Sequence, residues 1–148
     1  MAEQNNGELA RTIYDRFNRN DLAGVLELAT EDWAGVAHHV GMSFAGKDGF
    51  MQFLQGFKGA FPDCAVTITN QVLAGDQIVN EISWVGSNTG PLQTPTGALP
   101  PTGRSVHSVA CEVWRIKDGK LAEIHNYQDG TAILAQLGLL PQPAPVGL

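Results

Sequence analysis

The chain has 148 residues, of which 43% are hydrophobic and 16% are charged, so we expect a folded domain and exclude a disordered chain. The net charge is −6, and the 9 Lys and Arg residues are scattered, which excludes the basic face that nucleic acids require. The sequence has neither a secretory signal nor an apolar run of ~18 residues long enough to span a membrane. We therefore expect one cytoplasmic domain over residues 1–140, without nucleic-acid or membrane partners, and a flexible tail over residues 141–148.

The first sixty residues predict three helices separated by a less regular segment. Apolar side chains recur at helical spacing over residues 8–17, and Asp21 is placed to cap a second short helix. Small and β-branched residues over 33–46 predict an irregular strand and a loop. Phenylalanine and leucine then return on one helical stripe over residues 47–61, which Pro62 ends. Such a stripe is typical of a helix face packed against the core.

Beyond Pro62 the hydrophobic period changes from helical to alternating. The segment 90–103, with its prolines and glycines, predicts a long loop, and residues 130–138 predict a closing helix that ends at Gly138. This order predicts an α+β fold in which helices pack on one face of a curved, mostly antiparallel sheet and leave a cone open to a ligand. The predicted strands cover residues 65–75, 77–90, 104–116 and 120–129. A hairpin turn at Gly75 joins the first two, and a second turn at Gly119 joins the last two.

The hairpin between the last two strands admits two registers. A two-residue turn at 118–119 places Asp129 opposite Ser108 and turns His107 to the other face. A three-residue loop at 117–119 places Asp129 directly opposite His107. Because the glycine is the only residue of this turn that adopts positive φ without cost, the three-residue loop is slightly favoured.

Polar side chains gather on one face of this hairpin. His125, Tyr127 and Asp129 occupy alternate positions of a strand and therefore share a face, which the favoured register also gives to His107. The mixture of apolar and polar groups predicts a pocket rather than a core. We expect Glu112 and Glu123 to be exposed strand charges. His38 and His39 are adjacent and face opposite sides of a strand, so no metal site is expected there.

Several stretches resemble the SnoaL-like polyketide cyclases of the nuclear-transport-factor-2-like superfamily. They include "FPDCAVTI", "PPTGR", "RIKDGK" and a terminal Asp followed eight residues later by "LG", and the resemblance spans roughly residues 8–138. It implies a cone-shaped fold that closes a ring in a small hydrophobic carbonyl substrate by intramolecular aldol condensation, without metal or organic cofactor. It also implies a sheet-mediated homodimer or homotetramer.

The resemblance places the general acid/base at Asp129, with His107 as its neighbour in the same pocket. An Asp before a helix is also an N-cap, and a lone His is often structural, so both residues have a structural alternative. Isomerase or hydrolase activity, or binding of a hydrophobic ligand without turnover, are the alternative functions. The expected substrate-binding residues are Tyr127, His125, His39, Asn88, Trp33, Phe53, Phe57 and Tyr14.

Overall fold

A computed structural model describes residues 2–140, and the expected tail, residues 141–148, lies outside them. The α+β architecture is confirmed: helices pack on one face of a large curved sheet. The helices are α1 (Ala2–Asn18), α2 (Leu22–Glu27), α3 (Gly46–Ala60) and α4 (Gly130–Gln136). The strands of the large sheet are β1 (Ala29–Ala37), β2 (Met42–Ala45), β3 (Ala65–Ala74), β4 (Gln77–Ser87), β7 (Ser105–Lys117) and β8 (Lys120–Gln128).

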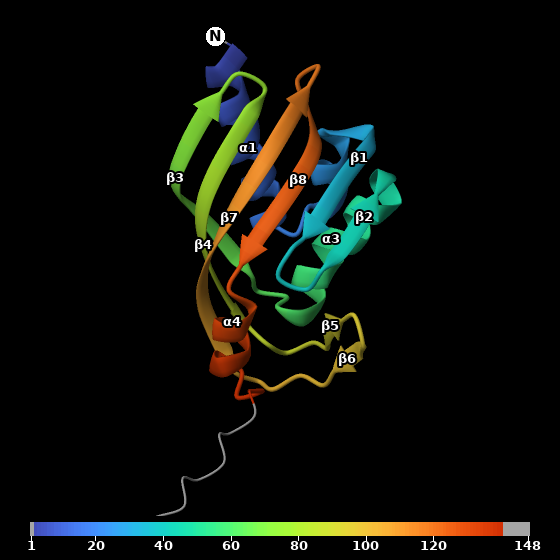
Figure 1. The fold of residues 1–148 in the computed structure, drawn as a ribbon, viewed down its shortest axis with the longest axis vertical. Coiled ribbons are helices and arrows are strands. Elements are labelled where there is room, and N and C mark those ends of the chain that lie inside the picture. Colours follow the sequence, from blue (N-terminus) through green and yellow to red (C-terminus); the bar gives the residue numbers. More distant parts are fainter. Residues whose placement is uncertain (1, 141–148) are drawn as a thin grey trace, which may run out of the picture.

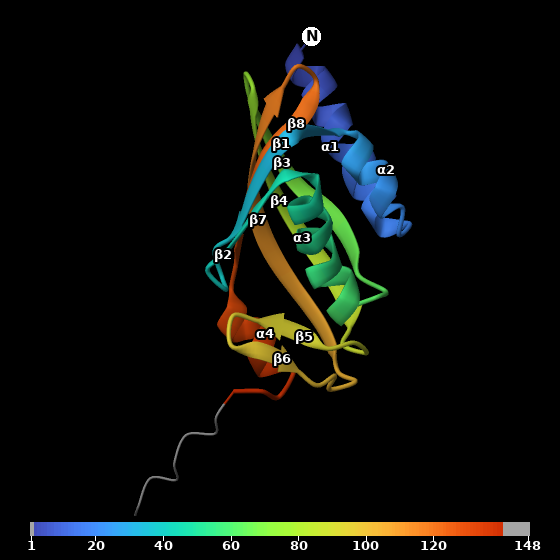
Figure 2. The same ribbon diagram turned by 90° about the vertical axis from the view of Figure 1, so that its right-hand side faces the viewer.

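The sheet has the order β2-β1-β8-β7-β4-β3, and β1 with β8 is its one parallel pair among the described residues. Figure 2 shows that α1, α2 and α3 all lie on the concave side of the sheet. Figure 1 looks onto the opposite, outer side, which no helix covers except α4 at its lower end. The fold therefore gives each strand one face toward the helices and one toward solvent.

The helices begin and end for the local reasons that the sequence predicts. The side chain of Asp21 accepts a hydrogen bond from the backbone N–H of Gly24 and caps α2, as expected. The stripe of α3 is buried at Phe50, Phe53 and Leu54. Phe50 stacks on Trp33 of β1 with ring centroids 4.1 Å apart, which fixes α3 against the sheet.

The favoured register of the β7–β8 hairpin is wrong. Asp118 and Gly119 both adopt positive φ, 52° and 76°, and form a two-residue turn that pairs Ile116 with Leu121. The pairing then shifts by one residue, because Arg115 pairs with Glu123. The intervening residue of β8 is the extra residue of a β-bulge. The predicted pair of His107 and Asp129 is therefore not formed, and the ladder ends where Ala110 pairs with Gln128.

The bulge also decides which face of β8 lies inside. His125 pairs with Val113 and Tyr127 with Cys111, so these side chains share one face, as expected. That face is the outer one, since Val109 on β7 is 66% exposed and Tyr127 is 46% exposed. The alternating partners Glu112, Ile124 and Asn126 are buried beneath the helices instead.

The predicted long loop contains a short hairpin, β5 (Leu92–Thr94) and β6 (Gly97–Leu99), so that expectation is wrong. Thr94 Oγ1 donates to the carbonyl of Gly97 over 2.6 Å and closes the turn. In Figures 1 and 2 this hairpin lies at the same end of the molecule as α4. Within residues 2–140, none of the helices has the length and apolar character of a membrane-spanning helix.

Candidate active site

A cavity of about 850 Å³ opens between α3, the β5–β6 hairpin, α4 and the concave face of the sheet. Its volume lies within the range of roughly 300–1,000 Å³ that small-molecule sites occupy. The aromatic part of its wall comes from β2, α3, the residue after α3 and β4: Phe44, Phe53, Phe57, Phe61 and Trp84. Three of the expected substrate-binding residues, His39, Phe53 and Phe57, line the cavity.

The polar part of the wall is almost entirely uncharged. It consists mainly of glutamine and threonine side chains, and among the described lining residues only His39 and Asp129 have an imidazole or a carboxyl group. Neither lysine nor arginine is among them, so the lining offers no cation to a carboxylate or a phosphate. The uncharged polar residues are Gln52, Gln55, Gln93, Thr94, Gln128 and Thr131.

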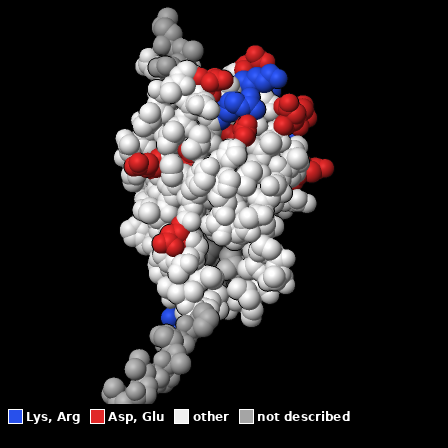
Figure 3. Space-filling model, in the orientation of Figure 1, with Lys and Arg blue, Asp and Glu red and all other residues white. Residues whose placement is uncertain are grey.

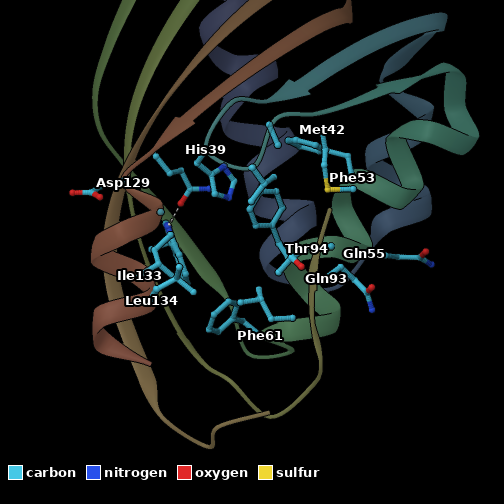
Figure 4. A pocket seen from close by; sticks show the side chains of 18 of the residues that line it. His39, Met42, Phe53, Gln55, Phe61, Gln93, Thr94, Asp129, Ile133 and Leu134 are labelled. Carbon is cyan, nitrogen blue, oxygen red and sulfur yellow. Dashed lines mark hydrogen bonds between the residues drawn. The ribbon is translucent and has the colours of Figure 1, made fainter. Parts of the chain in front are cut away.

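His39 points into this cavity, as Figure 4 shows. Its Nδ1 is buried and has no hydrogen-bond partner among residues 2–140. Burial lowers the pKa of His39, so the imidazole is neutral at neutral pH and carries a free lone pair. His38 faces the opposite side of the sheet, as the alternation of a strand predicts. His39 is thus the titratable ring that the fold presents to a ligand.

The carboxyl group of Asp129 points away from the cavity (Figure 4), although the residue borders it. Its Oδ1 accepts a hydrogen bond of 3.0 Å from the backbone N–H of Ala132. Asp129 is therefore the N-cap of α4, which confirms the structural alternative for this residue. Its role as acid/base stays a prediction.

The other predicted residues of the hairpin lie on the outer face of the sheet. His107, His125 and Tyr127 are separated from the cavity by the sheet itself. This face is largely uncharged, with acidic and basic groups gathered near the β7–β8 turn (Figure 3). Exposed valines, Val72, Val85 and Val109, add apolar surface to it. An oligomer built on this face stays a prediction.

Three further residues expected in the pocket are buried in the interior and do not line the cavity. Trp33 packs within the core against Phe50. Asn88 is fully buried, where its amide bonds the carbonyls of Ala60 and Gly90 and its oxygen accepts from Thr102. The third residue is Tyr14 of α1, whose hydroxyl group donates a hydrogen bond to a buried carboxyl group.

That carboxyl group belongs to Glu112, which the sequence wrongly predicts to be exposed. Burial raises the pKa of Glu112, while hydrogen bonds from Tyr14, Asn126 and Trp114 act in the opposite direction. Burial, followed by the negative charge of Glu112, raises the pKa of Tyr14. Glu112 and Trp114 are two positions apart on β7, so their side chains lie on the same face of the strand. A large apolar residue such as Trp114 usually faces the core, and this pattern indicates that Glu112 faces inward too.

A chain of hydrogen bonds connects this buried carboxyl group to the cavity. Trp84 Nε1 donates to Gln128 Oε1 over 2.9 Å, and Gln128 Nε2 donates to Asn126 Oδ1 over 2.9 Å. Asn126 Nδ2 then donates to Glu112 Oε2 over 2.8 Å. Because the indole only donates, its hydrogen bond fixes the orientation of the Gln128 amide, which in turn fixes that of Asn126. The amide of Gln128 is thereby held at the cavity wall.

Solved structures with the same fold have low sequence identity to this chain. A protein from Jannaschia sp. CCS1, assigned as a SnoaL-like polyketide cyclase, has a TM-score of 0.82 at 20% identity and covers 93% of this chain and 94% of its own. A Catenulispora acidiphila protein with a ketosteroid isomerase-like fold, in complex with trimethylamine, has a TM-score of 0.75 at 20% identity over 93% and 98%. IdmH from Streptomyces antibioticus, assigned as a polyketide cyclase, has a TM-score of 0.74 at 24% identity over 89% and 97%.

The match to a sequence family covers most of the chain. No curated protein sequence is significantly similar to it. The family model of the SnoaL-like polyketide cyclases, however, matches residues 8–137, nearly the range of the resemblance described above. That range contains α3, the large sheet and the whole cavity. The chain therefore belongs to the SnoaL-like polyketide cyclase family.

Proposed function

We propose that this protein is a cofactor-independent cyclase that closes a ring by intramolecular aldol condensation in an apolar carbonyl compound. The observation that carries this proposal is a neutral imidazole, His39, that points into a cavity lined by apolar and uncharged polar side chains, with the carboxyl group of Asp129 turned away. The family supports a cyclase as the general kind of enzyme.

The reaction needs one group that takes and then returns a proton. His39 removes a proton from the carbon next to one carbonyl, and the enolate carbon forms a bond to a second carbonyl carbon of the same molecule. The second carbonyl oxygen becomes an alkoxide and receives the proton from the imidazolium, so charge and atoms balance. A positioned acid/base contributes roughly 10²–10⁴-fold to such a step. The cavity would accelerate the reaction further by holding the two reacting ends of the substrate close together.

His39 is better placed for this role than Asp129. The ring of His39 points into the cavity, whereas the carboxyl group of Asp129 points away and is hydrogen-bonded to the start of α4. The lowered pKa of His39 also keeps the basic form populated at neutral pH. We therefore propose His39 as the acid/base instead of the pair of Asp129 and His107.

Gln128 supplies the second polar group of the proposed site. One of its amide hydrogens is bonded to Asn126, and its oxygen accepts from Trp84. The second amide hydrogen remains available to an oxygen atom of the substrate, and hydrogen-bond donors aimed at a developing alkoxide lower the barrier. The substrate class that fits is a neutral, flat compound with at least two carbonyl groups.

The test is conversion of aromatic compounds that carry a β-dicarbonyl side chain, followed by mass spectrometry and by NMR of the product. Ring closure keeps the mass, or lowers it by one water after dehydration. We expect His39→Gln to lower the rate by roughly 10²–10⁴-fold and Asp129→Asn, which keeps the cap, to leave it nearly unchanged.

The opposite ranking of these two variants would restore Asp129 as the acid/base and reject our assignment. A product with a shifted double bond but no new ring would indicate an isomerase. Saturable binding of the same compounds with no conversion would indicate a binding module.

A further inference from the structure

The indole ring of Trp84 reaches across a neighbouring strand to Gln128. Trp84 lies in β4 and Gln128 in β8, and β7 runs between these two strands. Trp84 pairs with Ser108 of β7, and Gln128 pairs with Ala110 of the same strand. Both of these β7 residues are buried and small, so they leave room for the indole above the strand. Its Nε1 donates to Gln128 Oε1 over 2.9 Å (dashed line in Figure 4).

The packing of Trp84 holds its N–H group in this direction. The side chain is only 5% exposed, although it borders the cavity. It meets the ring of Phe61 edge to face, with centroids 5.0 Å apart and 65° between the planes. A turn of the indole away from Gln128 would break this contact and leave a buried donor without a partner.

Trp84 is the end of the hydrogen-bond chain that admits one orientation. An indole only donates, so Gln128 turns its oxygen to Trp84 and its nitrogen to Asn126 Oδ1. The side chain of Asn126 has both a donor and an acceptor and can pair with Gln128 either way round. The carboxyl group of Glu112, next in the chain, accepts when ionised and donates when protonated. The direction of the chain is therefore determined by Trp84.

This direction decides which group Gln128 offers to the cavity that it borders. Among residues 2–140, Gln128 Nε2 makes one hydrogen bond, so its second hydrogen is left for a ligand. A carbonyl oxygen can accept that hydrogen. A ligand N–H at the same point would face another donor, or would have to share the oxygen that the indole already occupies.

We propose that Trp84 is a specificity-determining residue that acts through Gln128, so that the cavity prefers flat, neutral ligands with a carbonyl oxygen at this point over ligands with an N–H group there. The aromatic ring of Trp84 forms part of the wall, whereas its N–H group sets the orientation of the amide. The inference rests on the proposed function in one respect, that this cavity is the substrate site. It then identifies the carbonyl group that Gln128 receives as the one whose oxygen becomes the alkoxide.

Three flat, neutral tricyclic compounds test this preference without turnover. Fluorenone, carbazole and fluorene have C=O, N–H and CH₂, respectively, at the same position of the central ring. Their dissociation constants are measured by equilibrium dialysis against the full-length protein. We expect fluorenone to bind at least ~10-fold more tightly than carbazole and about 3- to 10-fold more tightly than fluorene, because it alone accepts the free hydrogen of the amide.

Two substitutions separate orientation from packing. Trp84→Phe keeps an aromatic wall but removes the N–H group, so the preference for fluorenone over carbazole should fall to about threefold or less. Gln128→Met should abolish the preference, and adding Trp84→Phe to it should change nothing further, because Trp84 acts through Gln128. A purely structural defect would instead weaken the binding of all three compounds alike.

Trp33→Phe is the matched control. It removes the N–H group of another buried indole, which has no hydrogen-bond partner among residues 2–140 and does not line the cavity. The preference for fluorenone should therefore be unchanged. Circular dichroism of each variant establishes that it is folded.

An NMR measurement on the wild-type protein tests the same contact without relying on the folding of any Trp84 variant. Fluorenone should shift the side-chain amide protons of Gln128, which are assigned by their loss in Gln128→Met, and carbazole should not. The proposal is overturned if these protons do not respond to fluorenone, or if the wild type does not bind fluorenone more tightly than carbazole. It is equally overturned if folded Trp84→Phe keeps the full preference. Retained preference without ring closure of any dicarbonyl compound would reject the aldol reaction instead.

Discussion

The hydroxyl group of Tyr14 lies 2.5 Å from Oε1 of Glu112, although the two residues are 98 positions apart in the chain. This hydrogen bond joins α1 to β7, a central strand of the sheet, on the concave side of the sheet. It also gives a buried carboxylate one of its three donors. The contact therefore ties the first helix to the polar chain that ends at the cavity wall.

We expect Tyr14→Phe to lower the free energy of unfolding by roughly 1–3 kcal/mol, because a buried acceptor loses its donor while the packing of the ring is kept. Chemical denaturation measures the change. Tyr127→Phe is the control, because Tyr127 is exposed on the outer face and should have little effect. Equal effects of the two substitutions would contradict a structural role for the buried hydroxyl.

The pH dependence of stability should report on Glu112. Burial raises its pKa in the folded protein above the unfolded value of about 4.3, so the folded state binds the proton more tightly. The stabilising contribution is present below the unfolded pKa and is lost as the pH rises through the folded pKa. Denaturation curves over this window should show that loss in the wild type but not in Glu112→Gln. A difference between the two proteins that stays constant with pH would refute the assignment.

The proposed acid/base predicts an acidic limb in the activity profile. Since burial lowers the pKa of His39 from about 6.5, kcat/KM should stay level through neutral pH and fall only as the pH drops through that lowered value. The residual activity of His39→Gln should lack this limb. An acidic limb that survives the substitution belongs to another group and removes His39 from the mechanism.

Asp129 should affect stability more than chemistry. Asp129→Ala removes the N-cap of α4 and is expected to cost about 0.5–2 kcal/mol, whereas Asp129→Asn keeps a capping oxygen and should cost far less. Thermal denaturation ranks the two variants. If both are equally destabilised, the cap is not the reason for an aspartate at this position.

Asn88 is expected to hold the loops that carry the β5–β6 hairpin. Its side chain makes four hydrogen bonds, to Ala60, Gly90 and twice to Thr102. Asn88→Ala leaves buried backbone groups unpaired and should cost roughly 1–3 kcal/mol. Hydrogen exchange should accelerate in the hairpin, residues 92–99, before it does in β4. Uniform exchange throughout the protein would show that the anchor is not local.

Local rules in the sequence predict most of the elements. The cap at Asp21, the stripe of α3 and the period-two strands follow from contacts within a few residues, and the structure confirms them. The alternation of His125 and Tyr127 is likewise correct, because it depends only on strand geometry.

Long-range pairing is what the sequence does not reveal. The favoured register is wrong, yet it groups His107, His125 and Tyr127 on one face as the structure does; local alternation does not reveal that this face, predicted to line the pocket, is the outer one. One pattern argues against that assignment: Arg115 and Glu123 share the alternation of His125 and belong at a solvent face. The burial of Glu112 and the meeting of His38 with His125 depend on neighbours 98 and 87 positions away.

The extra residue of the bulge, Ala122, lies between the pairs Ile116–Leu121 and Arg115–Glu123. Without it, the alternation set by the turn would continue, and His125 and Tyr127 would exchange places with Asn126 and Gln128. The strand thus has two sets of side chains, and one small extra residue determines which set faces the helices. Deletion of this one residue would exchange the inward and outward faces of β8 in a single step and turn Gln128 away from the cavity, a change that would otherwise need several substitutions.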